Sequence, residues 1–263
     1  MKYLFLIFLA MFISCSSEDD SVNVDDQEQE PGEQGIKLYS KSEFTSDGNT
    51  YVSNEYFYNE SFQIDSIRNF VPASITDHFS IEYNNDQVEQ ITKSRWRDYN
   101  SSTEITLYDE VNYIQNKIEL VSDDEIIEIY FSGEYVDSTK TYNPINPTNV
   151  FKQTFTRNSE NNLVENNTGG DIFQYSDFDI GKKLDPSGSG MEYELSQYFD
   201  VFKLKVSANN PTTINYSQPA GSVEDTYSYE LEYDEDGFVT TSRNEGSANF
   251  SEHFYIELQY DEV

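Results

Sequence analysis

Residues suited to nucleophilic chemistry are scarce in this chain. It contains one cysteine, Cys15, and two histidines, His78 and His253, and it has no Gly-x-Ser-x-Gly motif. A zinc site needs three or four ligands, so both histidines would have to meet beside carboxylates to form one. Each histidine instead lies in an acid-His-Phe phrase that precedes an apolar run, which favours a strand position. The sequence therefore predicts neither a nucleophile–base pair nor a catalytic residue.

Carboxylates, by contrast, are abundant. Glycoside hydrolases use two carboxyl groups that lie ~5–10 Å apart across the scissile bond. With 49 Asp and Glu residues in the chain, some pairs will meet that spacing by chance. A carboxylate-based glycoside hydrolase is therefore an alternative function without named residues.

Two acidic turns are suited to a hard cation. Calcium takes six to eight oxygen ligands; Asp234 and Asp236 lie in one turn, and Asp123 and Asp124 lie in another. The first turn lacks the downstream glutamate of an EF-hand, and Asp236-Gly237 is also what a tight hairpin turn requires. These four aspartates are weak candidate ligands, and calcium is the only cofactor that the sequence suggests.

The only tryptophan has polar neighbours that suit carbohydrate binding. Trp96 lies between Arg95 and Arg97, and Tyr99 follows closely. A flat aromatic ring offers an apolar face to a sugar while its polar neighbours bind hydroxyl groups. These four residues are the candidate ligand site. The alternative is that Trp96 covers the core and the arginines pair with nearby acids.

The elements that would position these residues are strands. Aromatic residues make up 15% of the chain, with 21 Tyr and 18 Phe. They alternate with polar residues, so that Phe79, Ile81 and Tyr83 are separated by Ser80 and Glu82. Period-two alternation indicates half-buried strands, and the acidic opposite face indicates contact with water. The sequence predicts an all-β, mostly antiparallel fold.

One phrase recurs along the chain: an apolar residue, any residue, a tyrosine and a turn-forming residue. Copies lie at 56–59, 81–84, 173–176, 231–234 and 258–261, with a looser copy at 106–109. Tyr58, Tyr83 and Tyr108 follow one another at intervals of 25 residues, and a fixed period of this size marks stacked supersecondary units. Two strands and two turns fill such a period. The unit is thus a hairpin, with the tyrosine at the strand end just before the turn.

The copy at 229–240 is the fullest, and it resembles the YD (RHS-type) repeat and the C-terminal hairpins of uncharacterised Bacteroidetes lipoproteins. Tyr233, Asp234 and Gly237 match the Tyr, Asp and Gly of that motif. The resemblance implies repeated β-hairpins and no assigned activity. We expect an elongated, curved sheet of hairpins with one short helix and long loops, and a sandwich or an open barrel is the alternative.

Two segments, 132–170 and 176–220, interrupt the hairpin rhythm and are expected to form long loops. In the second segment, Ser189 lies three residues before Glu192, as in a capping box. Apolar residues then follow at helical spacing: Met191, Leu195, Tyr198, Phe199 and Phe202. This pattern predicts a short helix that packs on the apolar face of the sheet, and a lid over a ligand is the alternative.

The N-terminus has the layout of a secretory signal. Lys2 precedes an eleven-residue apolar run that ends at Ser14 and Cys15, which is shorter than the ~20 residues of a spanning helix. The small residue Ser14 directly before Cys15 resembles the cleavage box of a bacterial lipoprotein signal. Phe12 departs from this box, which usually has leucine at that position. The resemblance implies cleavage after residue 14 and lipidation of Cys15. The alternative is ordinary cleavage that leaves Cys15 a free thiol.

The residues after the cysteine predict a tether and a destination. Segment 16–35 holds eight acids and no basic or aromatic residue, so 15–35 is expected to be a lipidated, disordered tether that precedes a domain over 36–263. The acidic run at 18–20 resembles the export signal of Bacteroidetes lipoproteins. It implies an outer-membrane lipoprotein that faces the cell exterior.

The charge of the chain limits its partners. Its net charge of −33 excludes nucleic acid, which requires a basic surface, so the membrane is expected as a partner only through lipid on Cys15. We expect a non-enzymatic surface module that binds polysaccharide or another surface protein. The alternatives are a structural spacer or adhesin, a calcium-binding module and the hydrolase.

Overall fold

The computed structural model describes residues 37–46, 49–71, 75–97, 102–182, 195–218, 224–244 and 254–262. The contacts within the chain separate Met1–Gly35 from Ile36–Val263, and the second unit is described here. The signal segment, Cys15 and the tether lie outside the described residues.

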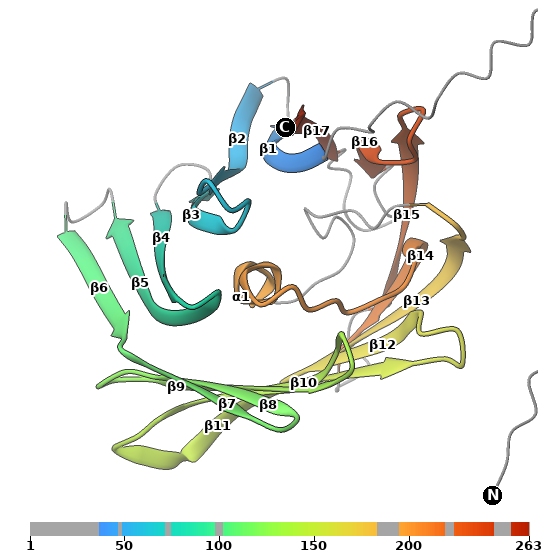
Figure 1. The fold of residues 1–263 in the computed structure, drawn as a ribbon. Helices are drawn as coiled ribbons and strands as arrows, with labels where there is room; N and C mark the ends of the chain where they lie inside the picture. The colour runs from blue at the N-terminus through green and yellow to red at the C-terminus, as the bar shows by residue number, and fades with distance from the viewer. Residues whose placement is uncertain are drawn as a thin grey trace, which may run out of the picture. The chain divides into compact units, whose positions relative to one another are not determined.

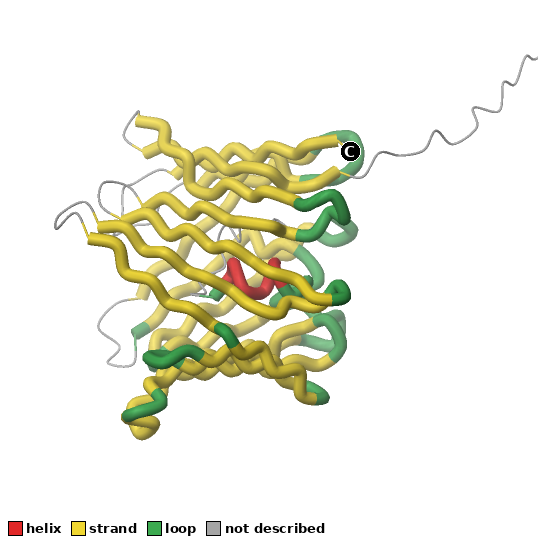
Figure 2. Tube along the Cα trace, turned by 60° about the vertical axis from the view of Figure 1, so that its left-hand side comes forward, coloured by secondary structure: helices red, strands yellow, loops and turns green. Residues whose placement is uncertain are grey.

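The second unit is one antiparallel sheet of seventeen strands that curls into a nearly closed barrel (Figures 1 and 2). The first six strands are β1 (Lys37–Ser46), β2 (Asn49–Tyr58), β3 (Ile64–Val71), β4 (Ile75–Asn84), β5 (Gln87–Arg97) and β6 (Ser102–Tyr108). The next six are β7 (Glu110–Ile114), β8 (Lys117–Val121), β9 (Ile126–Ser132), β10 (Tyr135–Asn143), β11 (Asn146–Arg157) and β12 (Leu163–Thr168). The last five are β13 (Asp171–Asp179), β14 (Asn210–Ser217), β15 (Glu224–Tyr233), β16 (Val239–Asn244) and β17 (Phe254–Glu262). Antiparallel pairing of β1 with β17 joins the first strand to the last, and of the expected arrangements the structure shows the open barrel.

The wall has one seam, between β6 and β7. These two strands run in the same direction and are separated only by Asp109, so they act as one kinked strand. Its first half pairs with β5 and its second half pairs with β8. Tyr113 holds β7 against β5, because its hydroxyl lies 3.0 Å from the Val88 nitrogen and 3.2 Å from the Val88 oxygen. Among the described strands, none pairs with the other edge of β6.

Alternation along each strand separates an apolar inner face from a polar outer face. In β4, Phe79 and Ile81 are buried while His78, Ser80 and Glu82 are exposed. The buried apolar residues of the other strands join them in one core cluster inside the ring. The predicted all-β antiparallel fold, with one face in contact with water, is confirmed.

The recurring tyrosine is a backbone latch at one end of the barrel. The hydroxyls of Tyr58, Tyr83 and Tyr260 donate hydrogen bonds of 2.7, 2.8 and 2.9 Å to carbonyl oxygens near the start of the preceding strand. The acceptors are the carbonyls of Tyr39, Ile64 and Val239. Each bond satisfies a polar backbone group that would otherwise be costly to bury. The expectation that the tyrosine anchors the strand end is confirmed at these positions.

The turn-forming residue of the phrase also has a defined role. The Asp234 carboxylate accepts hydrogen bonds from the backbone of Asp236 and Phe238, and Gly237 has a φ of +82°. Asn59 and Asn158 accept the corresponding bonds in the turns before β3 and β12. Such Asx turns let a side chain replace a backbone partner. The hairpin connection is therefore a five-residue Asx loop. Within the dipeptide Asp236-Gly237, the glycine has a positive φ and the aspartate does not.

The single described helix, α1 (Ser196–Val201), lies inside the ring (Figure 1). The prediction of a short helix is confirmed, although its first residue follows Leu195, which makes no side-chain cap. Tyr198 and Phe199 are buried, and they pack edge-on against Tyr108 and Phe155 of the wall. The helix therefore fills the lumen with apolar contacts.

The segment after α1 is joined to the wall by hydrogen bonds. Lys205 exchanges backbone bonds with Glu134 and Val136, and the Ser207 hydroxyl accepts a bond from Leu163 at 3.0 Å. The expected long loop at 132–170 is wrong for most of that segment, because β10, β11 and β12 occupy it. Several of its Asn and Pro residues lie in turns or at exposed strand positions, and Asn166 is buried in β12, so local composition does not distinguish these strands from a loop.

Candidate functional site

A cavity of about 610 Å³ lies inside the barrel, beside the first turn of α1. It is at the end of the barrel that carries the β8–β9 connection, which we call the loop end. Small-molecule sites commonly have volumes of ~300–1,000 Å³. Its lining residues come from β3, β4, β5, β9, β10, β11 and α1 and from the β8–β9 connection. They include Asn69, Asp77, Phe79, Lys93, Arg95, Glu125, Thr141, Phe151, Gln197 and Tyr198.

An ion pair forms one wall of this cavity. Arg95 donates two hydrogen bonds to the Asp77 carboxylate, from Nε at 2.7 Å and from Nη2 at 2.6 Å. The Lys93 ammonium lies 3.9 Å from the same carboxylate and 5.6 Å from the centre of the Phe79 ring. The hydrogen bond to Asp77 raises the pKa of Arg95, which stays charged. A two-bond fork of this kind fixes the direction of the guanidinium group.

Glu125 and Tyr198 line a second wall of the cavity, and both contact the buried Tyr108 behind it. Tyr108 donates a short hydrogen bond to Glu125, and the Tyr198 hydroxyl lies 3.3 Å from that of Tyr108. Burial raises the pKa of both tyrosines, with the negative charge of Glu125 adding to the effect. Both phenols are therefore neutral donors near neutral pH.

The register of the β4–β5 hairpin brings Asp77 and Arg95 together. Asn85 and Asp86 form the turn with φ of +50° and +64°, values typical of a two-residue hairpin turn. A bulge between Glu82 and Tyr83 then shifts the register by one residue. Asp77 consequently faces Arg95 and both side chains point inward. Without the bulge, Asp77 would face Ser94.

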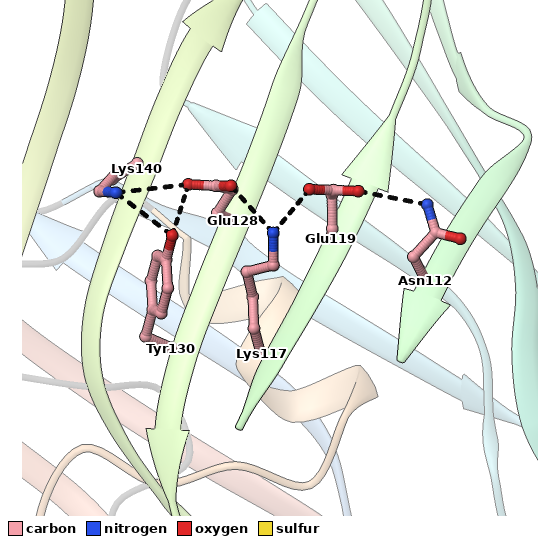
Figure 3. Close-up of polar contacts among 6 residues, drawn as sticks. All are labelled: Asn112, Lys117, Glu119, Glu128, Tyr130 and Lys140. Carbon is pink, nitrogen blue, oxygen red and sulfur yellow. Dashed lines mark hydrogen bonds and ion pairs between the residues drawn. The ribbon is translucent and has the colours of Figure 1, made fainter. Parts of the chain in front are cut away.

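A second charged cluster lies on the outer face of the same sheet, across β7 to β10 (Figure 3). Glu128 accepts a hydrogen bond of 3.0 Å from Lys117 and one of 2.8 Å from Tyr130, and it lies 3.6 Å from Lys140. Glu119 extends this outer ladder, 2.7 Å from Lys117 and 3.3 Å from the amide of Asn112. Although burial opposes ionisation, the bonds from Tyr130 and Lys117 lower the pKa of Glu128. The outer ladder is a charge-paired surface.

The residues of the predicted carbohydrate site separate in the structure. Arg95 points inward to Asp77, whereas its neighbour Trp96 lies on the outer face and is 41% exposed. Trp96 is thus beside Thr103 of β6 and not over the core. The side chain of Arg97 and all of Tyr99 lie outside the described residues. The pairing of an arginine with a nearby acid, expected as the alternative, occurs at Arg95.

The predicted calcium ligands lie in two separate turns. Asp123 and Asp124 are exposed in the β8–β9 connection. One carboxylate oxygen of Asp234 accepts hydrogen bonds from the backbone of its own turn. Asp236 is exposed beside it. Within the described ranges, no group of three or more His, Cys, Asp or Glu side chains is placed to hold a metal ion. Calcium binding stays a prediction.

Sequence reasoning missed Asp77, Lys93 and Glu125 as cavity residues. The turn at 85–86 was a usable signal, because counting outward from it pairs β4 with β5 and brings the basic residues near Asp77. The bulge has no such signal. Glu125 and Tyr108 lie 17 positions apart and meet through the β7–β8 hairpin, which pairs Glu110 with Val121, so no pattern within a few residues connects them.

Comparisons with known proteins bear on the fold alone. No family model matches the sequence and no curated protein matches it significantly, so the likeness to YD repeats has no support from a family match. Among solved structures, the chain is similar to a porin-like protein from Bacteroides vulgatus. The two share 9% identity at a TM-score of 0.50, over 87% of this chain and 100% of that one. A porin-like protein from Bacteroides uniformis is 13% identical, with a TM-score of 0.37 over 85% and 96% of the two chains. The first similarity supports the barrel fold.

Among the described residues, no helix has the length and apolar character needed to cross a membrane.

Proposed function

We propose that this protein is a non-enzymatic surface module that holds a polar, hydroxyl-rich ligand, such as a saccharide unit, in the cavity at the loop end. The observation that carries the proposal is the Asp77–Arg95 ion pair, which lines a cavity of about 610 Å³ inside the barrel. Binding sites typically combine apolar walls with a few fixed polar groups.

The chemistry of the lining fits a neutral polyol. Arg95, Lys93 and Gln197 offer donors, and Asp77 and Glu125 offer acceptors. These two acids balance the two basic residues, although the whole chain has 49 acidic and 16 basic side chains. The rings of Phe79 and Phe151 supply the apolar walls. A ligand without net charge therefore meets no uncompensated field in this cavity.

Two further features favour a binding role over a pore. A membrane-spanning barrel carries an outward apolar band and a polar interior, whereas the outer ladder of this barrel is charged and its core cluster faces inward. The lumen also contains α1, whose Tyr198 and Phe199 are buried against the wall. These features support a barrel that lies outside the outer membrane, and we propose that the lipid predicted on Cys15 attaches it. Intact-mass analysis of membrane-extracted protein tests the attachment, and a mature N-terminus other than Cys15, or the absence of acyl mass, would exclude it.

Thermal melting of the full chain across a panel of saccharides tests the cavity, because a ligand that binds only the native state raises the melting temperature. We expect a neutral saccharide to raise the melting temperature of the wild type and of Lys140→Ala, which alters the outer ladder. The rise should shrink for Lys93→Ala, which alters the cavity. An equal shift in all three proteins would place the ligand elsewhere, and the absence of any shift would argue against a saccharide. Parallel runs with calcium and with chelator test the calcium alternative.

A second candidate function, docking of another surface protein, is favoured by one observation. On the outer face of β5 and β6, Trp96, Ile105 and Leu107 are 41%, 68% and 42% exposed, beside the unpaired edge of β6. Exposed apolar groups on a strand edge favour pairing with another chain. Cross-linking on intact cells tests this role. It should give a protein adduct that Ile105→Lys abolishes, and an adduct that persists in the variant would exclude this surface.

A further inference from the structure

A second cavity, of about 360 Å³, lies at the opposite end of the barrel, where the tight turns before β3 and β5 are located. We call it the turn-end cup. Its walls come from β1 to β5, β7, β8, the end of α1 and the two residues that follow it. Five of its lining residues are aromatic: Tyr58, Phe62, Tyr83, Tyr113 and Phe202. This density of rings in one small cavity distinguishes the turn-end cup from the cavity at the loop end.

The hydroxyl groups of the cup tyrosines are engaged with the backbone. Tyr58 and Tyr83 donate to the carbonyls of Tyr39 and Ile64, and the Tyr113 hydroxyl contacts Val88. Phe62 and Tyr113 are 45% and 44% exposed, and Tyr113 packs edge-on against Phe202 at 6.2 Å between ring centres. The tyrosines are held in place by these bonds, so a ligand in the cup meets mainly aromatic carbon.

The charged residues that line the cup carry a net negative charge. Asp86 and Asp200 line it, and Lys203 is the only basic residue among its lining residues. The pKa of Tyr83 rises to about 12, first through burial and then through its neighbours Tyr113 and Asp65. Burial and the charges of Asp200 and Asp261 likewise raise the pKa of Tyr58. Aromatic faces and negative charge both attract cations.

The same end of the barrel already contains this type of contact. The ammonium of Lys182 lies 4.9 Å from the centre of the Tyr233 ring, whose hydroxyl donates a 2.7 Å bond to Asp179. An aromatic ring whose hydroxyl is bonded to a carboxylate thus lies against an ammonium group beside the β15–β16 turn. The turn-end cup offers more rings, two carboxylates and room for a ligand.

We propose that the turn-end cup binds a small organic cation of the alkylammonium class, with its aromatic rings around the cation and with Asp86 and Asp200 balancing its charge. Rings around a cation are the usual means of recognising quaternary ammonium groups. The exposed side chain of Lys203 opposes this binding by charge repulsion. The cup is separate from the loop-end cavity, so this site does not depend on the saccharide proposal.

The test is a calorimetric titration of the full chain with choline. The control ligand is dimethylbutanol, its neutral analogue with carbon in place of nitrogen. Because ring–cation contacts contribute about 0.5–2 kcal/mol, we expect choline to bind about ten-fold more tightly than the neutral analogue. Equal affinity for the two compounds, or no binding of choline, would overturn the proposal.

Matched variants separate ring electrostatics from apolar contact. Tyr113→Phe keeps the ring and should retain choline binding, whereas Tyr113→Leu keeps apolar bulk and should weaken it by about three-fold or more. Lys203→Gln should strengthen binding and Asp200→Asn should weaken it. If Tyr113→Leu binds choline as well as Tyr113→Phe does, or if Lys203→Gln binds less tightly than the wild type, the assignment is wrong.

Discussion

Asp77 and Glu128 are buried to the same extent, at 9% exposure each, but they lie on opposite faces of one sheet. Asp77 faces inward and is held by Arg95 and Lys93. Glu128 faces outward, beneath the side chains of Lys117, Tyr130 and Lys140. Equal burial therefore arises in two ways: closure of the barrel covers the inner acid, and a ladder of neighbouring side chains covers the outer one.

This difference between the two faces indicates where a ligand can bind. The outer ladder satisfies its own charges and borders bulk solvent, so it serves the surface of the protein. The inner pair borders a cavity whose other walls combine aromatic rings with polar and charged side chains. The inner pair is therefore the part of the sheet that a ligand can contact while it is shielded from bulk water.

The largest expected effect comes from removing the helix contact that separates the cavity from the rest of the lumen. Tyr198→Ala should lower the free energy of unfolding by about 3–5 kcal/mol, because it leaves a void beside Phe79 and Tyr108. Denaturant unfolding of the full chain measures this loss, with Trp96→Ala on the outer face as a control that should change stability by about 0.5 kcal/mol or less. A loss below about 1 kcal/mol for Tyr198→Ala would mean that α1 does not support the core.

Neutralising either acid, Asp77 or Glu128, should lower the free energy of unfolding by less than Tyr198→Ala does. Asp77→Asn should cost about 2 kcal/mol of unfolding free energy, because it leaves Arg95 and Lys93 without a counter-charge inside the barrel. Glu128→Gln should cost about 1 kcal/mol or less, because Lys117 and Lys140 can be hydrated and screened at the surface. Chemical unfolding at low and high salt checks both values. Equal costs with the same salt dependence would remove the distinction between the two faces.

High pH should lower the stability of the folded protein through Tyr83, which faces the interior of the barrel. The pKa of Tyr83 is about 12 in the folded protein, above the value of about 10 for an unfolded tyrosine. The unfolded chain therefore ionises first, and stability should be fully present below pH 10 and fall as pH rises toward 12. Unfolding midpoints of the wild type and of Tyr83→Phe across this range measure the effect. A fall of the same size in both proteins would assign it to other groups.

Low pH should lower the stability of the folded protein through Glu128 on the outer face, and this is the smallest of the expected effects. The pKa of Glu128 is lowered in the folded state, so its contribution is present above the unfolded value of about 4.3 and is lost as pH falls through the folded value. The stability difference between the wild type and Glu128→Gln should therefore shrink below about pH 4. A difference that stays constant with pH would contradict the assigned ion pairs.

The sequence predicted the parts of this fold that depend on local chemistry. Alternation indicated the strands, the phrase that contains Tyr58 or Tyr260 indicated the latched turns, and the spacing of Tyr198 and Phe199 indicated the helix. Each of these signals lies within a few residues, so a single sequence contains it.

The parts that depend on distant contacts could not be predicted in this way. Pairing of β1 with β17 joins the two ends of the domain, and no local pattern indicates it. The Asp77–Arg95 pair depends on a bulge at Glu82 that has no composition signal. The interpretation that put Arg95 beside Trp96 in one site overlooked that neighbours on a strand point to opposite faces.

The most direct test of the account is calorimetric binding of the best saccharide from the melting panel to the wild type and to Thr141→Trp. Thr141 lines the loop-end cavity, and a tryptophan there would occupy the space of the ligand while leaving the outer ladder and the turn-end cup intact. The account predicts that the wild type binds and that Thr141→Trp remains folded but does not. Undiminished binding to folded Thr141→Trp would contradict the claim that the ligand lies inside the barrel.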